Sequence, residues 1–82
     1  MQLRRGSDDV GMQLGDAMAR HSWHVDTLAA KIGADPLQVR RWLSGEELPD
    51  PNFMLRLYST LFQAGSFEWL AFATAYNQAR DN

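Results

Sequence analysis

The stretch that decides the fold is residues 25–45, which read VDTLAAKIGADPLQVRRWLSG. Its first part places apolar residues at three- and four-residue spacing, so that they share one face of a helix: Val25, Leu28, Ala29 and Ile32. Gly33 is expected to end this helix, because glycine tolerates the left-handed conformation that follows many helices. The sequence therefore predicts a short helix over residues 25–32.

A second helix is predicted after a very short connection. Asp35 can cap it, since its carboxylate accepts hydrogen bonds from the free N–H groups of a first turn. Pro36 suits the first helical position, where a missing N–H costs nothing. The inward residues of this helix are Val39, Trp42 and Leu43, and Gly45 ends it. The stretch thus encodes two helices joined by a glycine-containing turn.

Three further helices are predicted around this pair. One precedes it, with Ser7 as its cap and its end near residue 20, although Gly11 and Gly15 weaken its intrinsic helix propensity. Another begins at Asp50, and the last covers residues 67 to about 80. Because no strand-like alternation occurs anywhere, the expected fold is all-α with five helices.

The length of 82 residues fits one domain. Residues 1–7 are polar and are predicted to form a flexible N-terminal arm. Residues 8–64 form the domain that contains the two-helix unit, and residues 65–82 form a C-terminal helix that we expect to dimerise.

The composition argues against several classes of protein. There are no cysteines, which excludes disulfides and favours a reducing, cytoplasmic location. No apolar run approaches the ~20 residues of a membrane span. Catalytic and cofactor-binding motifs are missing, so we expect neither an enzyme nor a cofactor. His21, His24 and Asp26 lack a further convergent ligand, and no metal site is expected.

The charge distribution concentrates positive charge on the two-helix unit. The net charge of the chain is −2. Residues 20–45 carry a local +2, residues 1–19 carry −1 and residues 46–82 carry −3. A basic segment of this kind is the electrostatic signature expected of a phosphate-contacting surface.

The two-helix unit resembles the helix-turn-helix of the lambda-repressor and Cro-type (XRE) family. The matching positions fall within residues 14–61 and are Leu28, Ala29, Gly33, Val39, Trp42, Gly45, Pro49, Leu57 and Leu61. The resemblance implies a repressor-like, bacterial or phage transcription regulator that binds double-stranded DNA sequence-specifically as a homodimer. Its third helix would lie in the major groove.

The resemblance also implies a set of DNA-binding residues. Arg41 lies at a base-reading position, where a guanidinium matches the two acceptors of guanine. Arg40, beside it, suits a phosphate contact. The full set of candidates is His24, Leu37, Gln38, Arg40, Arg41 and Ser44.

Several positions depart from the family and keep an alternative open. Val25, Pro36 and Leu37 replace residues that are often polar in the family, and Glu46 and Glu47 would repel phosphate. These departures favour a protein-interaction module, antitoxin-like or adaptor, which keeps the helix-turn-helix fold without DNA reading. Its partner would be another protein.

The last predicted helix has two apolar faces on nearly opposite sides. One consists of Phe67, Leu70, Ala71 and Thr74; the other consists of Trp69, Phe72, Ala73 and Tyr76. Aromatic side chains are enriched in the cores of protein interfaces. We therefore predict that the second group forms the dimer interface and that the first packs within the chain.

Overall fold

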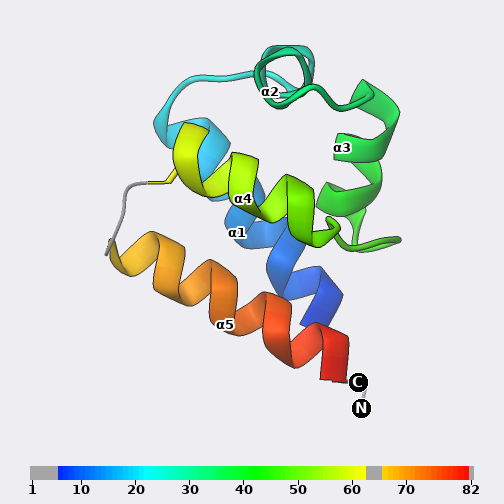
Figure 1. The fold of residues 1–82 in the computed structure, drawn as a ribbon, viewed down its shortest axis with the longest axis vertical. Helices are drawn as coiled ribbons and strands as arrows, with labels where there is room; N and C mark the ends of the chain where they lie inside the picture. The colour runs from blue at the N-terminus through cyan, green and yellow to red at the C-terminus, as the bar shows by residue number, and fades with distance from the viewer. Residues whose placement is uncertain (1–5, 63–65, 82) are drawn as a thin grey trace.

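The computed structural model of the chain describes residues 6–62 and 66–81. Five helices follow one another in this part of the chain, and no strand occurs in it: α1 (Gly6–Arg20), α2 (Val25–Ile32), α3 (Pro36–Ser44), α4 (Pro51–Thr60) and α5 (Phe67–Asp81). Figure 1 shows α2 and α3 at one end of the molecule and α5 at the other. The predicted all-α fold of five helices is confirmed for the residues described.

The ends of α3 form as the sequence predicts. The Asp35 carboxylate accepts a hydrogen bond from the Leu37 N–H at 2.8 Å, and the Gln38 side-chain oxygen accepts one from the Asp35 N–H at 3.3 Å. These two bonds make a capping box. Gly33 and Gly45 follow α2 and α3 with φ of 73° and 83°, in the left-handed region. The turn between α2 and α3 is therefore fixed at both of its ends.

Two other boundaries bear on the predicted domain limits. Helix α1 begins at Gly6, so Ser7 lies inside the helix and is not its cap. Residues 1–5 of the predicted arm lie outside the described residues. The predicted boundary between residues 64 and 65 also lies outside them, whereas the last helix is described. That helix begins as expected, because the Ser66 hydroxyl accepts a hydrogen bond from the Trp69 N–H at 3.1 Å.

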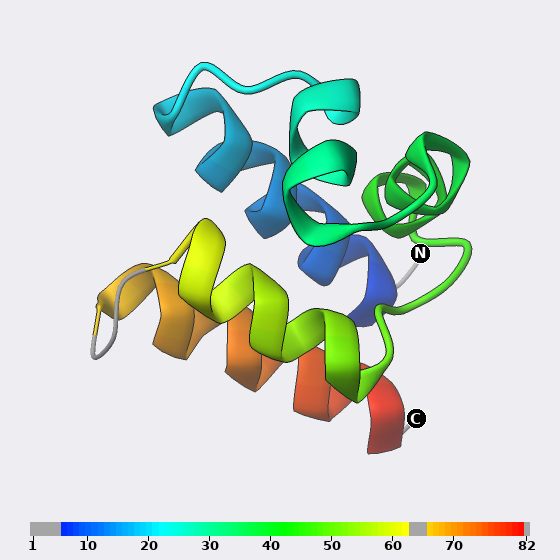
Figure 2. The same cartoon turned by 45° about the horizontal axis from the view of Figure 1, so that its top comes forward.

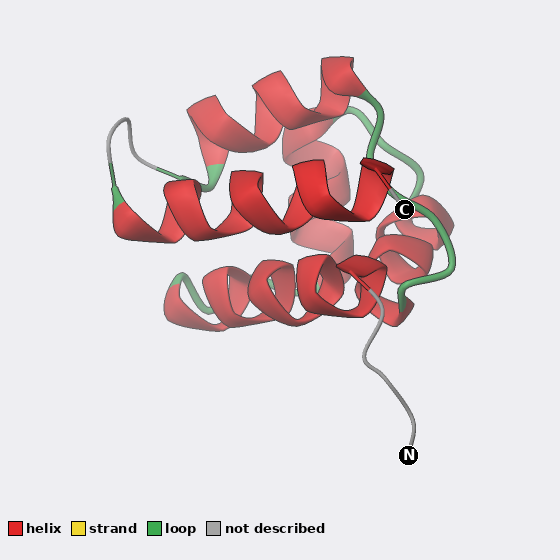
Figure 3. Ribbon diagram, turned by 90° about the horizontal axis from the view of Figure 1, so that it is seen from below, coloured by secondary structure: helices red, strands yellow, loops and turns green. Residues whose placement is uncertain are grey.

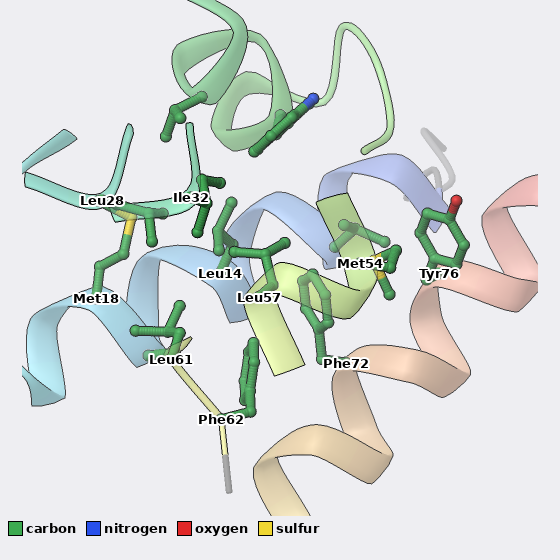
Figure 4. Close-up of a cluster of buried hydrophobic side chains, with 14 of the residues drawn as sticks. Leu14, Met18, Leu28, Ile32, Met54, Leu57, Leu61, Phe62, Phe72 and Tyr76 are labelled. Atoms are coloured by element: carbon green, nitrogen blue, oxygen red, sulfur yellow. The ribbon is translucent and has the colours of Figure 1, made fainter. Parts of the chain in front are cut away.

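Side chains from all five helices form one apolar core (Figure 4). Its largest fully buried members include Trp42, Phe72, Leu14, Leu28, Ile32 and Leu57. None of the buried side chains among the described residues is polar or charged. Burial of apolar surface is thus what holds these helices together. No helix in the described part of the chain has the length and apolar character to cross a membrane.

The two apolar faces of α5 pack in the reverse of the predicted arrangement: the face expected to pack within the chain is exposed, and the aromatic face packs inward. Phe72 is fully buried and Tyr76 is 6% exposed, and Trp69 stacks edge-on against Tyr58 of α4 with ring centroids 4.7 Å apart. Ala73 is half-buried. The assignment of Trp69, Phe72, Ala73 and Tyr76 to a dimer interface was therefore wrong, because α4 and α1 already cover this aromatic face. The other face of α5 is exposed.

Gly11 marks a close approach between α1 and α3. A Cβ atom on Gly11 would overlap the carbonyl oxygen of Leu43 and lie 2.8 Å from that of Trp42. At Gly15, one turn further along α1, the nearest atom to an added Cβ is the Leu43 Cδ2 at 3.6 Å, an ordinary contact. The packing of α3 on α1 therefore requires a glycine at residue 11 but not at residue 15.

We predict that Gly11→Ala lowers the free energy of unfolding by at least about 2 kcal/mol, because the new methyl group meets backbone atoms that cannot rotate away. Gly15→Ala is the matched control. It should raise the free energy of unfolding by up to about 1 kcal/mol, since alanine favours the helix more than glycine does. Urea unfolding followed by circular dichroism measures both, and similar effects of the two substitutions would contradict the close approach.

A second prediction concerns the start of α3. Asp35→Ala should destabilise the protein by about 1 kcal/mol, because it removes the side chain that caps the first turn. Asp35→Asn keeps an acceptor oxygen in the same place and should cost much less. If thermal melts show equal losses for the two variants, the side chain of residue 35 acts through its charge and not through the cap.

Candidate nucleic-acid interface

Helices α2 and α3 form a unit in which the second helix crosses the first steeply. Figure 1 shows α2 end-on while α3 runs within the plane, and Figure 2, turned by 45°, shows α2 along its length and α3 nearly end-on. Leu28 and Ile32 of α2 and Val39 of α3 are buried, and the two helices are in contact. This contact leaves the opposite face of α3 free to meet solvent.

The turn between the two helices is held from outside by α4. The Arg56 Nη1 donates a hydrogen bond of 2.8 Å to the carbonyl oxygen of Ile32, the last residue of α2. That oxygen is one of the carbonyls that a helix end leaves without an intrahelical partner. A Cβ on Gly33 would lie 3.0 Å from the same Nη1. This role of Arg56 could not be predicted from the sequence, because a side chain 24 positions away gives no local signal.

The outer face of α3 brings together four of the six candidate DNA-binding residues. Leu37, Arg40, Arg41 and Ser44 recur at spacings of three and four residues, and all four are exposed. Leu37 is 52% exposed although it is apolar. On the inner face, Val39 and Trp42 are buried and hold the helix against the core. The face therefore presents two guanidinium groups and one large apolar side chain on a helix that is firmly anchored.

Two candidates already make hydrogen bonds within the chain. The Gln38 side-chain oxygen takes part in the capping box, so its role at the start of α3 is structural. The Ser44 hydroxyl donates to the carbonyl oxygen of Arg41 at 3.1 Å. Each side chain keeps further hydrogen-bonding groups, namely the amide NH₂ of Gln38 and the lone pairs of Ser44.

Arg41 has an acidic neighbour that reduces its freedom to meet a ligand. Its Nη1 lies 3.9 Å from the Glu47 Oε2, and the two side chains are 47% and 40% exposed. An ion pair at this exposure contributes little to stability and weakens as salt rises. Its main effect is local, because Glu47 places a negative charge beside the guanidinium that the sequence analysis assigns to base reading.

His24 and Lys31 are the remaining polar groups of interest on or beside α2. His24 is exposed at the N-cap position, and its side chain makes no capping hydrogen bond. Lys31 places its ammonium 4.9 Å from the centre of the Trp23 ring, a cation–π contact that helical spacing does not predict. Among residues 6–62 and 66–81, no group of three or more His, Asp or Glu side chains could hold a metal ion.

In comparisons with known proteins, no protein-family model, curated protein or solved structure matches this chain.

Proposed function

We propose that the chain is a sequence-specific regulator that binds double-stranded DNA through the outer face of α3. The observation that carries the proposal is the pair of exposed arginines, Arg40 and Arg41, on a helix whose opposite face is anchored by buried Val39 and Trp42. In this proposal, α2 and α3 act as a helix-turn-helix, with α2 above the phosphate backbone and α3 in the major groove.

The dimensions and chemistry of α3 suit this role. An α-helix with its side chains is about 10–12 Å across, which matches the ~12 Å width of the major groove. Arg41 would donate to the two acceptor atoms of a guanine, while Arg40 would meet a phosphate. Leu37 has no hydrogen-bonding group on its side chain and would contact the methyl group of a thymine.

The ion pair between Arg41 and Glu47 supports a second candidate function. Glu47 offsets the charge of Arg41, and Leu37 exposes an apolar side chain on the same helix. A face with less positive charge and an exposed apolar group also suits a protein partner. In that case the chain is an interaction module of the antitoxin or adaptor type that does not read DNA. Selection of bound sequences from a random duplex pool at low salt separates the two functions, since only the first enriches a common sequence.

For the enriched duplex, we predict that Arg41→Ala weakens binding by about 1–3 kcal/mol and relaxes the preference at one base pair. Arg40→Ala should weaken all sequences alike and flatten the dependence of affinity on salt. Arg80→Ala on α5 removes the same charge far from α3 and serves as the control. Fluorescence anisotropy titrations at two salt concentrations measure these effects. Unchanged affinity for both α3 variants would exclude α3 as the reading helix.

We also predict that Glu47→Gln strengthens DNA binding, because it releases Arg41 from the ion pair and removes a charge that repels phosphate. The gain should be greatest at low salt and should fall as salt rises. Combining Glu47→Gln with Arg41→Ala should leave only the part of the gain that comes from phosphate repulsion. A weaker complex for Glu47→Gln alone would show that Glu47 orients Arg41 for binding and does not compete for it.

A further inference from the structure

Leu37 is an apolar side chain that the fold itself does not need. It lies on the outer face of α3 and is 52% exposed, and it belongs neither to the buried core nor to the side chains packed against that core. Only its backbone has a structural role, because the Leu37 N–H donates a hydrogen bond of 2.8 Å to the Asp35 carboxylate as part of the helix cap. The side chain therefore stands on a fixed turn of helix, where it can contact a ligand.

Arg41 is the neighbour of Leu37 on this face. The two residues are four positions apart, which places them about 6 Å apart along the helix axis and on the same side of it. A recognition helix contacts base edges chiefly through its N-terminal residues, and helix residues three or four positions apart meet successive bases. Leu37 is the second residue of α3 and Arg41 is the sixth, so the short side chain lies at the end near the bases and the long one lies further along. The pair thus suits two adjacent base pairs.

The two side chains recognise different chemical groups. Arg41 donates hydrogen bonds, and the two acceptors on the major-groove edge of guanine match its guanidinium. Leu37 offers no donor or acceptor, so it gains only where it removes an apolar group from water. In the major groove that group is the 5-methyl group of thymine. A cytosine methylated at the same ring position carries the same methyl group into the same groove. For Leu37, thymine and 5-methylcytosine are therefore alike, whereas uracil and cytosine offer it no methyl group.

We infer that the outer face of α3 reads the 5-methyl group of a pyrimidine in the base pair next to a guanine, so that methylation of a cytosine at this position strengthens binding. The inference rests on the proposed function, and it adds the methylation state of the DNA to what α3 discriminates. Arg41 supplies the contact to the guanine and Leu37 supplies the contact to the methyl group. Each methyl group should change the dissociation constant about fourfold, which corresponds to the ~0.8 kcal/mol of one buried CH₂ group.

Duplexes that differ by one methyl group test this inference. The starting duplex is the sequence enriched from the random pool, and its guanine is the base whose preference relaxes in Arg41→Ala. On each side of that guanine in turn, the pyrimidine of the neighbouring base pair is made thymine, uracil, cytosine or 5-methylcytosine, with the complementary purine opposite. In fluorescence anisotropy titrations, the wild type should bind the methylated member of each pair about fourfold more tightly at one of the two neighbours: thymine over uracil, and 5-methylcytosine over cytosine.

Two variants assign the methyl effect to a side chain. Leu37→Ala should remove both differences, because the shortened side chain no longer reaches the methyl group, and it leaves the backbone N–H of the cap in place. Leu55→Ala is the matched control and should keep both differences, since Leu55 is 69% exposed but lies on α4. Circular dichroism melts verify that both variants are folded.

The outcomes separate this inference from the proposed function. Equal affinities of the wild type within each pair, at both neighbours, would overturn the inference and leave α3 as a DNA-reading helix. Differences that persist in Leu37→Ala would also overturn it, since the methyl group would then act through the shape of the DNA. If the random pool yields no enriched sequence, the proposed function fails and the inference fails with it.

Discussion

The structure depends on the backbone contact between Gly11 of α1 and the carbonyl groups of Trp42 and Leu43 at the end of α3. No side chain lies between the two helices at this point, so no change of rotamer can relieve a misfit. The contact therefore fixes the position of α3 relative to α1 more strictly than ordinary side-chain packing would. Because α1 also packs along α5 (Figure 3), this contact sets the position of α3 relative to α5 as well.

Much of the fold could be predicted from the sequence because helix ends carry local signals. Asp35 with Pro36 predicts the start of α3, and Gly33 and Gly45 predict the turns that follow α2 and α3; the structure confirms each of these. The role of Gly11 could not be predicted in this way. In the sequence, a glycine within a helix only lowers propensity, and the carbonyl groups that it admits belong to residues more than thirty positions later.

The use of α5 was beyond sequence reasoning for a different reason. Both faces of the helix are apolar, so periodicity alone cannot decide which one packs inward. The neighbouring helix decides it: Phe62, just after α4, stacks on Phe72 with ring centroids 4.9 Å apart, and Tyr58 meets Trp69.

At the candidate site, the exposure of Arg40 and Arg41 followed from helical spacing. The use of Gln38 in the cap and the pairing of Arg41 with Glu47 depend on side-chain geometry that spacing does not specify.

The hydrogen bond from Arg56 to the last carbonyl of α2 gives a residue outside the outer face of α3 control over where that face lies. Arg56 lies on α4, yet it fixes the point where the chain turns from α2 into α3. If α3 reads DNA as proposed, a random mutagenesis screen for loss of binding would therefore recover substitutions at Arg56 together with those on the outer face of α3. Natural relatives would be expected to change residues 33 and 56 together, since the glycine and the guanidinium occupy adjoining space.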